Sequence, residues 1–126
     1  MKESPIFSKM FDFVAWIVTT TTKYPREHRF ILAASLQRMT LAAEESLIRA
    51  AQATAPDAAL AHLQEAATQL TLVRFYTRLS EKLGLISARQ YEYVTECLRE
   101  ISKLHTGWCK VAQRLPSAKA TPAPSA

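Results

Sequence analysis

Glycine is scarce in this chain, which has only Gly84 and Gly107 among its 126 residues. Proline is limited to six residues, three of which lie beyond residue 115. Tight hairpin turns depend on residues that tolerate positive φ, so the body of the chain has few places to form them. The scarcity argues against a sheet built from hairpins and favours long helices.

The chain also lacks long apolar runs and has only two cysteines, Cys97 and Cys109. No apolar run approaches the ~20 residues that span a bilayer, and there is no secretory apolar segment. The cysteines are twelve residues apart in one predicted helix, about 18 Å at 1.5 Å per residue, which is too far to pair. We therefore expect a soluble cytoplasmic protein with no membrane partner and two reduced thiols.

The motifs of several enzyme classes are missing as well. The sequence has no Gly-rich phosphate loop, no Cys-x-x-Cys and no His-Glu-x-x-His. A di-metal bundle enzyme needs Glu-x-x-His on two helices, and the nearest pattern here is the reversed pair His62-x-x-Glu65. We expect no catalytic residue, no metal and no cofactor. A bundle enzyme with a metal site is the competing hypothesis, which elemental analysis would test.

What the sequence does contain is helical periodicity. Apolar residues recur at steps of three and four in four stretches, which cover residues 6–22, 26–55, 57–83 and 87–115. Pro25 and Pro56 separate the first three, with Asp57 as the expected N-cap of the third. Gly84 is the expected stop before a capping box at Ser87-x-x-Gln90. The pattern predicts an all-α, antiparallel up-and-down four-helix bundle over residues 1–115, followed by a disordered tail over residues 116–126.

The apolar stripes predict which faces are buried. The last helix has one seam, formed by Tyr91, Val94, Leu98, Ile101, His105, Trp108, Ala112 and Leu115. The second helix has two stripes, one with Phe30, Ala34, Leu41, Ile48 and Ala51, the other with Leu32, Leu36, Met39, Ala43 and Leu47. The third helix has a seam from Leu60 to Thr77 and a second one of Leu72, Phe75, Leu79 and Leu83. Two stripes on a helix predict contact with more than one neighbour. Cys97, His105 and Trp108 are interpreted as packing residues.

The net charge of +5 and the pI near 9.5 favour a nucleic-acid or acidic-protein partner. In an antiparallel bundle the first and third turns share one end, where we expect Lys23, Arg26, His28, Arg29 and Arg89. A second group lies toward the opposite end and comprises Lys103, Lys110 and Arg114. Arg74 and Arg78 share one face of the third helix, where they contact a partner or pair with Glu44 in a structural role.

Four segments, taken in order and spacing, resemble one known family. They are Pro25-Arg26-x-His28-Arg29-Phe30-x-Leu32, Leu70-x-x-Val73-Arg74-Phe75-x-x-Arg78-Leu79, Leu85-Ile86-Ser87-x-x-Gln90-Tyr91-Glu92 and Glu100-Ile101-x-x-Leu104-x-x-Gly107-Trp108. Together they resemble the four-helix-bundle accessory variability determinant (Avd) proteins of diversity-generating retroelements. The resemblance covers nearly the whole chain except the tail.

The resemblance implies a non-enzymatic accessory protein that assembles as a homopentameric barrel. Such a protein binds the retroelement's reverse transcriptase and its template RNA and supports mutagenic reverse transcription (retrohoming). Arg26, Arg29, Arg74 and Arg78 match the family's motif arginines. Ala33, Ser102 and Thr106 stand where family members often have glycine. Two alternatives stay open: a ribosomal RNA intervening-sequence bundle protein, and a purely structural helical oligomer.

Overall fold

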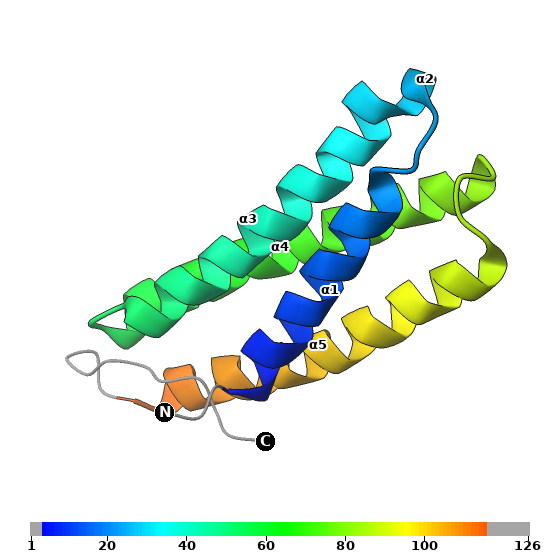
Figure 1. The fold of residues 1–126 in the computed structure, drawn as a ribbon. Helices are drawn as coiled ribbons and strands as arrows, with labels where there is room; N and C mark the ends of the chain where they lie inside the picture. The colour runs from blue at the N-terminus through cyan, green and yellow to red at the C-terminus, as the bar shows by residue number, and fades with distance from the viewer. Residues whose placement is uncertain (1–3, 116–126) are drawn as a thin grey trace.

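The computed structural model describes residues 4–115, which form four long helical segments (Figure 1). The first is α1 (Pro5–Thr21). The second is one continuous helical run made of α2 (Arg26–His28), the π-helical turn η1 (Arg29–Ala33) and α3 (Ala34–Gln52). The third and fourth are α4 (Pro56–Lys82) and α5 (Ala88–Arg114). The predicted all-α fold is confirmed. The predicted tail over residues 116–126 lies outside the described residues.

The helices follow one another in an antiparallel arrangement. Helix α3 packs against α1 and α4, α5 packs against α4, and α1 also contacts α5. The α1–α2 connection and the α4–α5 turn consequently lie at the same end of the bundle (Figure 1). Helices α4 and α5 have 27 residues each, which at 1.5 Å per residue makes the bundle about 40 Å long.

The helix boundaries agree with most of the local signals in the sequence. The amide of Gln90 donates to Ser87 Oγ at 3.0 Å, and the amide of Ser87 donates to Gln90 Oε1 at 2.8 Å, so the predicted capping box is present. Gly84 ends the preceding turn with a φ of 75°, a conformation that side-chain-bearing residues rarely adopt. This turn therefore has the geometry that its sequence predicts.

The predicted N-cap at Asp57 is wrong. Helix α4 begins one residue earlier, at Pro56, with Ala55 as its N-cap residue. Proline suits the first helical position because its φ is already helical and the amide it lacks would have no partner there. Asp57 lies in the first turn instead, where its carboxylate favours the helix through the helix dipole.

The core is formed by the facing seams of the helices. Helix α5 contributes buried residues at the predicted seam positions, namely Val94, Leu98, Ile101, Trp108 and Ala112. Trp108 is 0% exposed, and its ring meets Phe7 edge-on with ring centroids 5.9 Å apart. Its interpretation as a packing residue is confirmed.

The π-helical turn η1 was not predicted from the sequence, which favours an uninterrupted α-helix from Arg26. A π turn accommodates an additional residue and changes the angular position of what precedes it. Here Leu32 and Ala33 reach the core, while Phe30 and Ile31 point outward and are 85% and 71% exposed. Across residues 4–115, no helix has the length and apolar character needed to cross a membrane.

Candidate functional site

One end of the bundle is organised by Tyr24, which follows α1 and is almost fully buried. Burial raises the pKa of the Tyr24 phenol, and an interaction with Ser80 of α4 partly offsets that effect. Arg29 Nε donates to the Tyr24 carbonyl at 3.2 Å. These contacts hold the α1–α2 connection against the C-terminal part of α4, beside the turn that leads into α5 (Figure 1).

Cations gather at this end, which we call the basic end. Six fully charged cations belong to it, all of them exposed: Lys23, Arg26, Arg29, Arg78, Lys82 and Arg89. His28 is half-buried among them. The same segments contain two carboxylates, Glu27 and Glu81. The ion pairs within residues 4–115 are Lys9 with Glu100 and Arg99 with Glu96, so all six cations lack an ion-pair partner there. The sequence-based prediction of a shared basic end thus agrees with the geometry.

Lys82 is a member of the basic end that the sequence interpretation missed. The spacing could have identified it, because Arg74, Arg78 and Lys82 follow one another at steps of four residues. Residues at this spacing share one helix face. A shallow surface hollow is lined by Phe75, Arg78, Leu79 and Lys82. The exposed Phe75 ring therefore lies next to two cations, a combination suited to nucleic acid because bases stack on aromatic rings.

The ten predicted site residues do not form one surface. From Arg89 to Arg114 the helix α5 advances 25 residues, about 38 Å. Lys103, Lys110 and Arg114 are therefore remote from the basic end, although all three are exposed. Arg74 lines a groove between α4 and α5 that is described below, one helical turn before Arg78 of the basic end.

The alternative in which Arg74 or Arg78 pairs with Glu44 is wrong. Neither arginine forms an ion pair with any residue in the described range, and both are exposed. The side-chain amide of Gln69 on α4 lies 2.9 Å from Ser46 Oγ and hydrogen-bonds to it, so this side of α3 faces α4. Glu44 is two residues earlier, about 200° around the helix, and therefore lies on the side away from α4.

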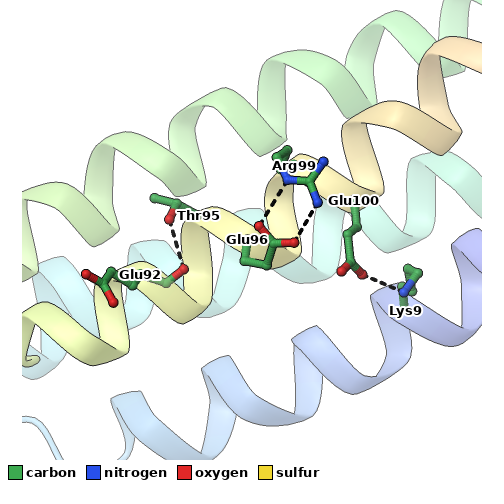
Figure 2. A network of polar contacts seen from close by, with 6 residues as sticks. All are labelled: Lys9, Glu92, Thr95, Glu96, Arg99 and Glu100. Atoms are coloured by element: carbon green, nitrogen blue, oxygen red, sulfur yellow. Dashed lines mark hydrogen bonds and ion pairs between the residues drawn. The ribbon is translucent and has the colours of Figure 1, made fainter.

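A polar network ties α1 to α5 and uses two cations (Figure 2). Lys9 Nζ donates to Glu100 at 2.5 Å, and Arg99 donates twice to Glu96, at 3.0 and 2.6 Å. The hydrogen bond to Glu100 raises the pKa of Lys9, and the one from Arg99 lowers the pKa of Glu96. Lys9 and Arg99 are therefore neutralised, unlike the cations of the basic end.

The described residues show no arrangement for nucleophilic or metal chemistry. Cys97 and Cys109 are half-buried, and burial raises the pKa of both thiols. A raised pKa keeps a thiol protonated and unreactive at neutral pH. Within residues 4–115, no three His, Cys, Asp or Glu side chains come together as metal ligands.

An apolar surface runs along α1 and α3, and we call it the α1–α3 face. It lies around a contact in which Gln37 Nε2 donates to Thr21 Oγ1 at 2.8 Å. On α1 its exposed residues are Phe11 and Val18, and on α3 they are Leu41 and Ile48, at steps of three, four or seven residues from that pair or from one another. We count with this face the exposed ring of Phe30, which lies within the π turn of the same helical segment. Phe30, Leu41 and Ile48 belong to the stripe that was predicted to be buried. A single chain leaves this stripe exposed, because α3 already fills the core with its other stripe.

A second apolar surface lies on α4, and we call it the α4 face. Leu72, Phe75 and Leu83 are exposed, whereas Leu79 between them is half-buried. These residues form the second seam predicted for this helix. The chain thus exposes two apolar surfaces on different helices, and isolated soluble proteins rarely expose large apolar patches.

Comparison with known proteins gives one match. The model of a protein family described as bAvd-like matches residues 6–112, which span all four helical segments. No curated protein and no solved structure shows significant similarity to the chain.

Proposed function

This chain belongs to the bAvd-like family, and from that premise we propose that it is an accessory protein of a diversity-generating retroelement. In this role it binds the reverse transcriptase and the template RNA and supports mutagenic retrohoming without catalysing a reaction itself. The basic end is the surface assigned to the RNA. The observation that carries this assignment is its six exposed cations, which have no ion-pair partner within residues 4–115.

The chemistry of this surface favours phosphate contact over base reading. Arginine forms bidentate hydrogen bonds to phosphate oxygens, and lysine adds point charge. Neutralising phosphates releases counterions, so affinity falls steeply with salt. If all six cations of the basic end contact phosphates, the logarithm of the affinity should fall with a slope of roughly −4 against the logarithm of salt concentration.

The direct test is co-purification. We expect the full chain, co-expressed with the reverse transcriptase of the proposed retroelement, to retain that enzyme and RNA at low salt. Chain expressed alone should bind template RNA with the steep salt dependence given above. Failure to retain either partner at low salt would overturn the proposal. A reading frame embedded in a ribosomal RNA gene would point instead to the intervening-sequence proteins.

We further propose that the functional form is the homopentameric barrel implied by the family resemblance. Its support is the pair of exposed apolar surfaces, the α1–α3 face and the α4 face. Because the two surfaces differ, one can pack on the other in a head-to-tail contact, and such contacts close into a ring when the rotation fits. Five copies would bring the net charge to roughly +25 and repeat the basic end around the ring.

Charged substitutions on the α1–α3 face should dissociate the assembly. We expect Phe30→Glu combined with Ile48→Glu to convert pentamer to monomer in light scattering after size-exclusion chromatography, because the glutamates would be buried without partners. Helical circular dichroism should persist, since both side chains are exposed in the single chain. Arg49→Glu, an exposed site on α3 turned about 80–100° from Leu41 and Ile48, is the matched control and should remain pentameric. Wild-type protein that is monomeric at tens of micromolar would contradict the assembly.

A further inference from the structure

A groove lies between α4 and α5, and its Arg74 is one helical turn before Arg78 of the basic end. It has a volume of about 220 Å³, several times the ~30 Å³ share of a liquid water. Its lining includes one guanidinium, three hydroxyls and one imidazole, and no carboxylate. The residues on α4 are Ala67, Leu70, Thr71 and Arg74, and those on α5 are Leu98, Ser102, His105 and Thr106.

Three solvent-exposed side chains of this groove have donors that a ligand can use, because none of these donors is bonded to another group within residues 4–115. Serine and threonine hydroxyls inside helices commonly bond back to a carbonyl one turn earlier, and Thr71 does so, donating to the Ala67 carbonyl at 2.9 Å. Ser102 and Thr106 form no such bond. They are four residues apart, so both lie on the same side of α5. Arg74, from the opposite wall, is the third donor without a partner.

His105 fixes the position of the α5 wall. Its Nε2 lies 2.7 Å from the Leu63 carbonyl of α4. A carbonyl only accepts, so Nε2 carries the proton and donates. The other ring nitrogen, Nδ1, lies 3.8 Å from Cys109 Sγ. This bond between α5 and α4 fixes the spacing of the two helices beside Ser102 and Thr106, and therefore the position of their hydroxyls relative to Arg74.

We propose that the α4–α5 groove binds a phosphate group. A tetrahedral oxyanion presents oxygens to both walls at once, so the fork of Arg74 can hold one side while the hydroxyls of Ser102 and Thr106 donate from the other. Charge-assisted bonds of this kind are roughly twice as strong as neutral ones. The argument for the site uses the residues of the groove alone, and where the phosphate belongs to RNA the site rests on the proposed function and extends it.

Two sources could supply the phosphate, a free phosphate and the backbone of an RNA strand. The test is a titration of the full isotopically labelled chain, followed by amide chemical shifts, with inorganic phosphate in one arm and a ten-nucleotide single-stranded RNA in the other. Saturable shifts centred on Ser102 and Thr106 in either arm support the site and identify the source. No saturable shift there in both arms overturns it.

Variants distinguish a specific phosphate site in the groove from a general attraction of phosphate to positive charge. Arg74→Gln should weaken binding at the groove about tenfold or more, and Ser102→Ala with Thr106→Ala about tenfold while leaving the net charge unchanged. Arg38→Gln removes the same charge from an exposed position on α3 and should change nothing. Equal losses from Arg74→Gln and Arg38→Gln would overturn the proposal. Because all of these residues lie outside the basic end, failure here leaves the proposed function standing.

Discussion

Replacing four arginines of the basic end by glutamine, at positions 26, 29, 78 and 89, is expected to lower RNA affinity by two to three orders of magnitude at 0.1 M salt. Each phosphate contact on a single strand contributes about 0.7 to the salt slope. Four lost contacts reduce the slope by about 3 and the affinity by roughly 600-fold at 0.1 M relative to a 1 M reference. Fluorescence anisotropy of labelled template RNA over a range of salt concentrations measures both quantities.

The matched control removes as many charges from elsewhere on the chain. Lys103, Lys110, Arg114 and Arg38 are all exposed outside the basic end, and their replacement by glutamine gives the same net charge. We expect this control to lose far less affinity and to keep most of the salt slope. If both quadruple variants lose affinity equally, RNA responds to the overall charge of the protein, and the basic end is not a site.

Replacing Trp108 by alanine is expected to lower the free energy of unfolding by about 3–5 kcal/mol. The indole is 0% exposed and packs on Phe7, so truncation leaves a cavity in the C-terminal part of the α5 seam. Domains of this size are stable by about 5–15 kcal/mol in total, which makes this loss severe. Urea unfolding followed by circular dichroism, at one fixed protein concentration, measures it.

Trp108→Phe distinguishes packing from polar contact at the same position. The indole Nε1 is buried and has no hydrogen-bond partner among the described residues. Phenylalanine keeps most of the ring and removes this unsatisfied donor, so its cost should be about 1–2 kcal/mol or less. A loss as large as that of Trp108→Ala would mean that the N–H group makes a stabilising contact, contrary to the structure.

The sequence predicted the helices and their topology because those depend on local chemistry. The capping box at Ser87 and the stop at Gly84 act within a few residues, and three-four spacing identified the α5 seam. The shared basic end followed from antiparallel order alone. Asp57 shows the limit of this reasoning, because proline took the first helical position and moved the start of α4.

Burial of the second stripes could not be predicted in the same way. Periodicity shows that Phe30, Leu41 and Ile48 share a face, but it does not show whether that face is covered by the same chain or by another. The structure shows that the chain does not cover this face itself, since these residues are exposed in a single chain. Likewise, spacing could relate Lys82 to Arg78, but the groove at Arg74 depends on which faces of α4 and α5 meet.

The π turn η1 divides the second helical segment into two parts whose side-chain directions are set in different ways. Residues 34–52 are oriented by the core, whereas residues 26–30 are oriented by the number of residues in the turn. Each residue added to or removed from an α-helix rotates everything beyond it by about 100°. A single insertion or deletion at residue 31 would therefore turn Arg26 and Phe30 together to a new direction while Leu32 and Ala33 stay in the core. One-residue length changes at this turn would reorient the proposed RNA contact and the proposed subunit contact in a single step.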